Sequence, residues 1–422
     1  MSQVGGLGRH PNFLKLWGGQ TISLLGSEIT LLALPLTAIL VLKVTPLELG
    51  VLGAAQSAPF LLLSLPAGVW VDRLPRRPLL VGADLGRAFL LGCVPIVAFF
   101  GTLHIELLYA VGLGVGALTA IFDVAYQSFL PEVVARGQLV EGNAKLEISR
   151  SVGQIVGPSA GGLLVQWLTA PIAIAADSVS FVISAMAFAT LRSPEPIRAS
   201  REPRRSIVGE MCDGLRVALT SPLLRTLAAA GGAYNLFGNV LFSVFLLYAT
   251  NELGLQPAAL GLILSVAGPA GLVGALLASR VPARLGLGRT LVGTLVVGTL
   301  GRMLILIAGG PVEAVVVLLV VARALLSVWV PIYGVTALSI RQGITPDNLR
   351  GRVNATNRFL QWGTLPVGSL IGGALGGTIG LRLTIGVAVA GTLVAITWFV
   401  LSPVRDLREA PAEMRAPAHV GG

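Results

Sequence analysis

Long apolar segments, each followed by a short polar stretch, recur along the chain from Leu14 to Pro403. A helix needs roughly 20 mainly apolar residues to cross a bilayer, and membrane helices tolerate Gly and Pro. The pattern therefore predicts an all-α integral membrane protein with about twelve transmembrane helices. We expect these helices at residues 14–42, 47–71, 78–101, 105–130, 146–168, 171–191, 223–250, 257–279, 289–310, 312–340, 354–379 and 381–402.

Composition and charge agree with this prediction. Hydrophobic residues make up 54% of the chain and charged residues 12%, which leaves too few polar side chains to cover a water-soluble globule. Of 30 Lys and Arg residues, the spans place two, Lys43 and Arg382, in alternate loops and three, Arg87, Arg302 and Arg323, inside helices, which leaves 25 on the other side. The positive-inside rule makes that side cytoplasmic, so both termini are expected inside a bacterial cytoplasmic membrane. The net charge of +10 is thus attributed to topology and lipid contact, and no nucleic-acid partner is expected.

Other functional classes find little support in the sequence. The segment 1–8 lacks the features of a removable signal peptide, and the three histidines have no ligand spacing. Cys93 falls in a span and Cys212 in a cytoplasmic segment, so neither is expected to form a structural disulfide. The phosphate-binding motif GxxxxGK[ST] and the catalytic motifs GxSxG and HExxH are absent. We expect no enzyme, no cofactor and no metal.

The apolar pattern is interrupted at length only once, before Pro222. The predicted division is a six-helix bundle at 1–191, a linker at 192–222, a second six-helix bundle at 223–403 and a cytoplasmic tail at 404–422. The linker is basic and proline-rich at first, and its second part has the apolar spacing of an interfacial helix.

The two predicted halves share a sequence pattern, which indicates duplication. Pro131-Glu132, Arg136-Gly137 and Asn143-Ala144 in the first half are echoed by Pro346-Asp347, Arg350-Gly351 and Asn354-Ala355 in the second. Two pseudo-symmetric bundles would hold substrate between them near the membrane midplane.

A charged loop follows the second predicted helix and contains Gly68, Asp72, Arg73, Arg76 and Arg77. It resembles the signature loop between helices 2 and 3 of the major facilitator superfamily. A carboxylate at a cytoplasmic helix end can accept hydrogen bonds from cations or a helix N-terminus of the other half and act as a conformational latch. The alternative is a basic loop that serves topology alone. The matching loop of the second half has Ala283 where the Asp would stand.

The fifth predicted helix contains Gly153, Gly157, Pro158, Gly161 and Gly162. This arrangement fits the GxxxGPxxGG pattern that antiporter branches of the same superfamily show. Small residues at this spacing allow close helix approach, and Pro bends a helix, as a hinge or seal between halves requires. The alternative is ordinary packing through small residues.

The segments 9–28 and 349–353 and the sixth helix with Asp177 resemble a bacterial exporter branch of that superfamily. The branch includes macrolide and multidrug efflux proteins and the enterobactin exporter. The resemblance implies the major facilitator fold, a small-molecule substrate, alternating access and a monomer.

Ionisable residues at membrane depth indicate function, because they are costly to bury. Glu28, halfway along helix 1, is the first candidate for proton coupling, and Asp123 in helix 4 is the second. Both could instead belong to permanent ion pairs, for example with Arg323 or Arg87. Asp84, Arg87 and Asp177 are expected to be structural, since helices 3 and 6 are peripheral in the family.

Helices 1, 4, 7 and 10 line the central cavity in the family. The resemblance therefore implies that the polar residues of these helices bind substrate, namely Gln20, Ser27, Tyr126, Gln127, Asn235, Asn239 and Arg323. We expect a proton-coupled exporter, or antiporter, of amphipathic small molecules or drugs. A dedicated siderophore or metabolite exporter, a weaker importer hypothesis, and an uncoupled lipid-handling scaffold or receptor stay open.

Overall fold

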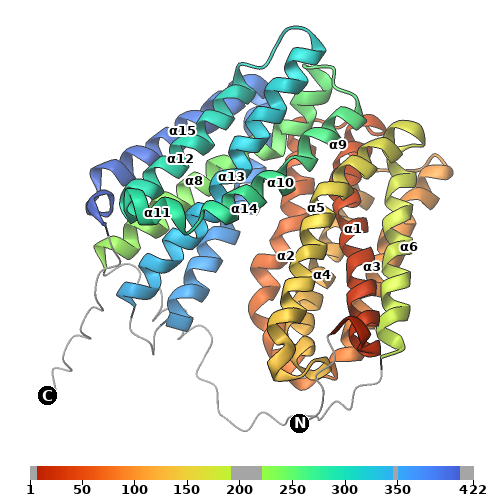
Figure 1. The fold of residues 1–422 in the computed structure, drawn as a ribbon. Helices are drawn as coiled ribbons and strands as arrows, with labels where there is room; N and C mark the ends of the chain where they lie inside the picture. The colour runs from red at the N-terminus through yellow and green to blue at the C-terminus, as the bar shows by residue number, and fades with distance from the viewer. Residues whose placement is uncertain (1–6, 192–220, 346–349, 409–422) are drawn as a thin grey trace, which may run out of the picture. The chain divides into compact units, whose positions relative to one another are not determined.

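The computed structural model describes residues 7–191, 221–345 and 350–408, and these residues form helices and connecting turns without a strand (Figure 1). The predicted basic linker and interfacial helix, and the Pro346-Asp347 pair, lie outside the described residues. The main helices are α1 Pro11–Leu40, α2 Pro46–Arg73, α3 Arg76–Phe99, α4 Ile105–Val133, α5 Leu139–Trp167, α6 Ala170–Ala189, α8 Pro222–Asn251, α9 Pro257–Ser265, α10 Ala267–Leu277, α11 Arg280–Leu285, α12 Leu287–Leu306, α13 Val312–Ile344, α14 Arg350–Ile379 and α15 Leu381–Leu401.

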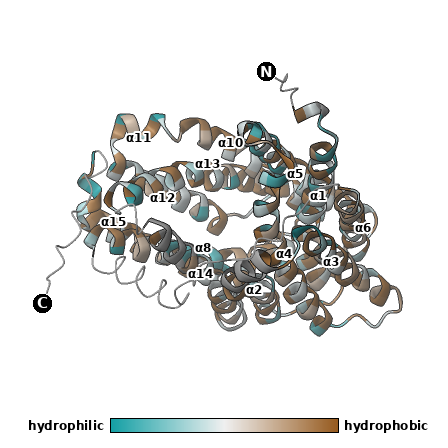
Figure 2. Cartoon of the chain, turned by 90° about the horizontal axis from the view of Figure 1, so that it is seen from below, coloured by the Kyte–Doolittle hydropathy of each residue, from teal (hydrophilic) through white to brown (hydrophobic). Residues whose placement is uncertain are grey.

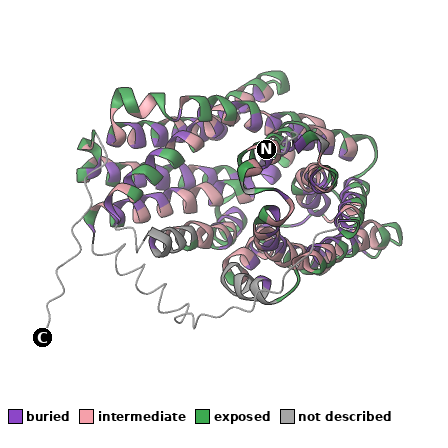
Figure 3. Ribbon diagram, turned by 60° about the horizontal axis from the view of Figure 1, so that its bottom comes forward, coloured by how far each residue is buried: buried purple, intermediate pink, exposed green. Residues whose placement is uncertain are grey.

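The helices have the length and surface of membrane-spanning segments. Ten spans among the described residues are long and apolar enough to cross a membrane, with α9 and α10 together forming one of them. The more polar α5 and α14 have 29 and 30 residues. Large apolar side chains are exposed along the helices, such as Leu62 at 66%, Phe89 at 71% and Val394 at 63%. Figure 2 colours much of the helices as hydrophobic, and Figure 3 marks exposed residues along them. Such an apolar exterior suits lipid rather than water, and the all-α membrane fold is confirmed.

Several helices extend beyond the apolar segments that predicted them. Helix α5 begins at Leu139 rather than residue 146, α14 begins at Arg350 rather than 354, and α13 continues to Ile344. Hydropathy detects the part of a helix that lies in lipid, whereas charged residues can continue the same helix into the headgroup region. Local caps set some ends. Thr45 and Glu48 form a reciprocal capping box at the start of α2, with Thr45 N–H donating to Glu48 Oε2 at 2.7 Å.

The span predicted at 257–279 is confirmed as Pro257–Leu277, but it is not one continuous helix, because the structure interrupts it at Val266 between α9 and α10. Pro269 has no N–H to donate to the carbonyl of Ser265, and its ring would clash with that carbonyl in a continuous helix. A further short helix, α11, occupies the segment expected to be a loop and ends at Leu285, directly before Gly286, whose φ of +83° suits a glycine.

The chain divides into two compact units: Met1–Glu202 with Ala249–Gly268, and Pro203–Tyr248 with Pro269–Gly422. The four-part division drawn from the sequence stays a prediction. In the first unit, α1 packs on α5 and α6, α3 on α4 and α6, α2 on α4, and α9 on α5. Its core includes Phe13, Leu16, Phe122, Phe129 and Phe188.

In the second unit, α12 packs on α13 and α15, and α14 packs on α15. Helix α8 joins this group through Tyr234, whose hydroxyl donates to the carbonyl of Leu295 at 3.2 Å. The chain after α15 covers the start of α12, where Gly288 N–H donates to the carbonyl of Leu407 at 2.8 Å. This contact satisfies one of the N–H groups that a helix start leaves unpaired.

Candidate functional site

One face of α5 is a stripe of small residues at four-residue spacing: Ser149, Gly153, Gly157 and Gly161. Helix α1 lies along this stripe. Near its start, Trp17 Nε1 donates to Ser149 Oγ at 2.8 Å. Further along, a Cβ added at Gly161 would lie 3.2 Å from the Cα of Ile29, so the two backbones approach closely.

Glu28 lies in the middle of this interface. It is half-buried and follows Pro11, the first residue of α1, by 17 positions in a helix of 30 residues. A Cβ added at Gly157 would collide with the Cβ of Glu28, and one added at Gly153 would lie 3.8 Å from Glu28 Cγ. The candidate carboxyl and the glycine motif, predicted from separate signals, therefore belong to one contact between α1 and α5.

The rest of the motif faces α9. A Cβ added at Gly162 would lie 3.0 Å from the Cα of Gly261, and one added at Gly261 would collide with the carbonyl oxygen of Pro158. Ser159 N–H donates to Ser265 Oγ at 3.0 Å, and the two hydroxyls lie 2.7 Å apart. Small residues on two faces thus let α5 pack closely against α1 and α9 at once.

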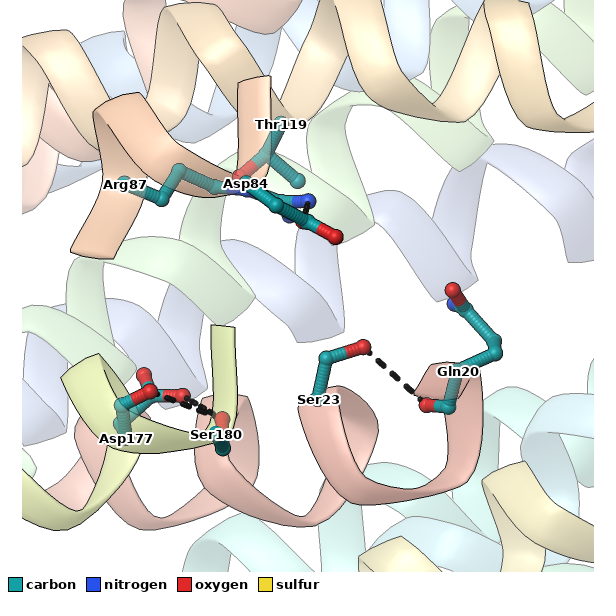
Figure 4. A network of polar contacts seen from close by, with 7 residues as sticks. All are labelled: Gln20, Ser23, Asp84, Arg87, Thr119, Asp177 and Ser180. Atoms are coloured by element: carbon teal, nitrogen blue, oxygen red, sulfur yellow. Dashed lines mark hydrogen bonds and ion pairs between the residues drawn. The ribbon is translucent and has the colours of Figure 1, made fainter. Parts of the chain in front are cut away.

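A buried polar cluster occupies the same unit away from α5 (Figure 4). Arg87 Nη2 forms an ion pair with Asp84 Oδ1, and the guanidinium also lies 4.2 Å from the ring centroids of Phe122 and Phe181. Asp177 accepts a hydrogen bond from Ser180 at 2.9 Å on the neighbouring helix α6. The sequence predicted a structural role for Asp84, Arg87 and Asp177 but did not predict this ion pair, and their structural role stays a prediction.

Asp123, the second candidate carboxyl, is half-buried on α4 and within electrostatic reach of Arg87. Tyr126 stacks on Phe122 with ring centroids 5.7 Å apart, and its buried hydroxyl has no hydrogen-bond partner among the described residues. Gln127 is exposed. Asp123 therefore interacts electrostatically with Arg87 and, by its spacing on α4, also shares a helix face with Tyr126 and Gln127.

The remaining candidates on α1 are Gln20 and Ser27, which are both half-buried. The side-chain Oε1 atom of Gln20 is buried without a hydrogen-bond partner in the described part of the chain. The backbone carbonyl of Gln20 accepts a hydrogen bond from Ser23 Oγ at 3.1 Å. Their role in binding substrate stays a prediction. Among the described residues, no group of three or more His, Cys, Asp or Glu is placed to hold a metal ion.

The basic residues of the predicted latch contact helices of their own unit. Arg76 forms an ion pair with Glu132 and donates to the carbonyl of Ser128 at 3.0 Å. Arg77 Nε donates to the carbonyl of Phe188 at 3.1 Å, near the end of α6, where a cation also complements the helix dipole. Three other members of the motif, Gly68, Asp72 and Arg73, have side chains outside those that the structure describes. The latch itself stays a prediction.

The second unit contains a cavity of about 370 Å³. Three residues selected from the sequence line it, Asn235 and Asn239 from α8 and Arg323 from α13. Four more that sequence reasoning did not select as cavity residues also line it: Arg302, Trp329, Gln361 and Trp362. Arg302 could have been selected as a cavity residue from the sequence. It lies in a predicted span, whereas Glu252 and Asp347 fall between predicted spans and Glu313 is the second residue of one, so segment 223–403 has no acidic residue in the middle of a span.

The central contact of the first unit recurs in the second. Asn239 follows the first residue of α8 by 17 positions, as Glu28 does in α1, and Gly368 follows the first residue of α14 by 18 positions, as Gly157 does in α5. A Cβ added at Gly368 would lie 2.6 Å from the Cβ of Asn239. The same helix contact therefore holds a carboxyl in one unit and an amide in the other.

Comparison with known proteins identifies the family. Residues 7–420 match the model of a family described as transmembrane secretion effector. The chain is 31% identical over 396 residues to the multidrug efflux pump Tap of Mycolicibacterium fortuitum, an alignment that covers 89% of this chain and 91% of Tap. It is 25% identical to macrolide efflux protein A of Streptococcus pyogenes, over 94% of this chain and 96% of that protein.

A solved structure shares the fold. The crystal structure of the nucleoside transporter NupG superimposes with a TM-score of 0.72 and 15% sequence identity, covering 92% of this chain and 98% of that chain. At this identity the likeness concerns the fold alone. It confirms the two-bundle architecture expected from the duplicated sequence pattern.

Proposed function

The chain belongs to the transmembrane secretion effector family of major facilitator transporters, and from this premise we propose that it is a proton-coupled exporter of amphipathic small molecules. Its relatives are named as efflux pumps, which supports export rather than uptake. We place it in the cytoplasmic membrane of a bacterium as a monomer with both termini inside, in line with its basic loops. Lipids and protons complete the set of proposed partners.

The observation that carries the proposal is the position of Glu28. A carboxyl in the middle of a membrane helix is costly and calls for a function. Its Cβ packs against Gly157, within the α5 motif that resembles the antiporter pattern. A change in the charge of Glu28 therefore acts directly on the α1–α5 interface.

The proposed cycle uses this link. When Glu28 is charged, conformations in which water reaches its carboxylate are favoured. When Glu28 is protonated, a closed α1–α5 interface that excludes water is tolerated. Proton binding from one side and release to the other would thereby bias alternating access of the two halves around a midplane site. Cargo binding would favour the charged form, which gives exchange of cargo for protons.

Transport by purified protein in liposomes with an imposed pH gradient tests the proposal. Radiolabelled erythromycin, as a macrolide, and a panel of amphipathic drugs serve as cargo. We expect gradient-driven accumulation by the wild type. The Glu28→Gln variant should fall to the level of protein-free liposomes and yet bind cargo, because Gln keeps the size and hydrogen bonding of Glu but exchanges no proton in this range.

Two matched variants sharpen the test. Glu313→Gln changes an exposed carboxyl in the first turn of α13 and should transport normally. Asp123→Asn should show a partial defect at most, because Asp123 lies near Arg87 and is the second candidate. Gradient-driven accumulation by Glu28→Gln at the wild-type rate would falsify the role of Glu28. Transport that survives removal of every membrane carboxyl would remove proton coupling, and binding without any transport would favour the scaffold.

A further inference from the structure

Two buried N–H donor atoms on side chains that line the cavity of the second unit have no acceptor among the described residues. Arg302 is 6% exposed, and its Nη1 atom has no hydrogen-bond partner among the described residues. Its guanidinium carbon lies 4.0 Å from the ring centroid of Tyr234 in a cation–π contact, and the Tyr234 hydroxyl is also a hydrogen-bond partner of the Arg302 side chain. The Nε1 atom of Trp329 is likewise buried without an acceptor in the described chain. Both side chains line the cavity.

The sequence offers Arg302 no local counter-ion. Segment 223–403 has three acidic residues. Glu252 and Glu313 lie at helix ends, Asp347 falls between two predicted spans, and Arg302 lies within α12. A buried cation without a hydrogen-bonded anion carries a large desolvation penalty. An anion bound in the cavity would therefore offset the desolvation penalty of Arg302.

The other lining groups define the rest of the ligand. Trp329 and Trp362 offer aromatic surface, and Asn235, Asn239 and Gln361 offer amides that both donate and accept. Gly238 leaves the space that the Arg302 guanidinium occupies, since a Cβ there would lie 2.7 Å from Nη2. Such a cavity combines apolar walls with a few convergent polar groups, as small-molecule sites do.

We propose that this cavity binds the anionic group of an amphipathic aromatic cargo, with Arg302 as its principal cationic contact. Arg302 Nη1 and Trp329 Nε1 donate hydrogen bonds to a carboxylate or similar anion, while the tryptophan rings cover the aromatic part. The inference rests on the proposed function only in taking this cavity as the place where cargo binds. It makes organic acids, rather than cationic drugs, the preferred cargo class.

Two probes of nearly equal shape test the charge preference. 1-Naphthylacetate carries a carboxylate, and 1-naphthylacetamide carries a neutral amide in its place. Calorimetric titration of purified protein in a neutral detergent should give an affinity for the acid about tenfold or more above that for the amide, as expected for hydrogen bonds to a charged group. The preference should shrink as salt is raised.

Variants of the cavity assign that preference to Arg302. Arg302→Gln should lower the ratio of the two affinities several-fold, although Arg323 still lines the cavity, whereas Arg302→Lys should keep more of the ratio because the charge remains. Arg280→Gln, which removes an exposed arginine of the same unit, should leave the ratio unchanged. If Arg302→Gln does not fold, Gly238→Ala replaces it, since its methyl group displaces the guanidinium and should lower the ratio.

Equal affinity for acid and amide in the wild type, or an unchanged ratio in the Arg302→Gln or Gly238→Ala variant, would overturn the proposal. Binding of phosphatidylglycerol but not of naphthylacetate, lost in Arg302→Gln, would assign the site to a lipid headgroup and overturn it too. Calorimetry needs no transport, so the two proposals fail separately. A preference for the acid without gradient-driven transport would contradict the proposal of proton-coupled export. Gradient-driven transport of cargo without a preference for the acid would contradict only the proposal of an anion site.

Discussion

At the scale of single residues, similar acidic side chains in one unit have different neighbours, and the neighbours decide their roles. Asp84 forms an ion pair with Arg87, whereas Glu28 packs on the glycines of α5. Sequence spacing places Asp84 and Arg87 on one face of a helix, since they are three residues apart, although their ion pair was not predicted. It could not predict that Gly157 would pack on Glu28, since that contact joins residues far apart in the chain.

The buried ion pair gives a stability prediction with a defined order. Arg87→Met strips the counter-charge from Asp84 and should cost about 3–5 kcal/mol, the range for breaking a buried pair. Asp84→Asn should cost less, because Asp123 and Asp177 still act electrostatically on Arg87. The Asp84→Asn/Arg87→Met double variant should be more stable than Arg87→Met alone. Melting temperatures of the purified proteins check this order, and strictly additive losses would contradict it.

At the scale of helices, α5 shows how one motif serves two interfaces. Gly153, Gly157 and Gly161 face α1, while Pro158 and Gly162 face α9. The sequence correctly marked these positions for close helix approach. The sequence could not predict that two helices pack on α5, because a pattern of small residues indicates how closely a helix can approach but not which helix does so.

Replacing Gly157 by Ala should destabilise the α1–α5 interface by about 1–3 kcal/mol, the usual cost of overpacking. The added methyl group would meet the Cβ of Glu28, which sits on the helix backbone and has little room to move. Gly368→Ala should have a similar cost against Asn239. Gly293→Ala is the control. No heavy atom lies within 4 Å of its added Cβ, and it should be neutral or gain up to about 1 kcal/mol of helix propensity. Equal melting temperatures for Gly157→Ala and Gly293→Ala would contradict the close contact.

At the scale of the whole molecule, the sequence predicted the membrane class, the helices and the duplication, because bilayer thickness and backbone hydrogen bonding leave few alternatives. It missed the break at Val266, where Pro269 acts inside an apolar segment that hydropathy reads as continuous. It also did not select Arg302 for the cavity. The positive-inside rule counts arginines by side and carries no information on which cavity a membrane-embedded one faces.

The membrane topology of the chain determines the direction of transport in the proposed cycle. We predict that residue 205 is cytoplasmic and residue 313 external, because cytoplasmic loops are enriched in Lys and Arg. Single cysteines introduced as Arg205→Cys and Glu313→Cys, in a chain with Cys93→Ala and Cys212→Ser, can be labelled in intact cells with an impermeant maleimide. We expect labelling at 313 in intact cells and at 205 only after the membrane is opened. A cysteine at 382, in another loop predicted to be external, should behave like 313. Labelling at 205 in intact cells would invert the map, and proton entry along the gradient would then drive uptake in the scheme proposed for Glu28.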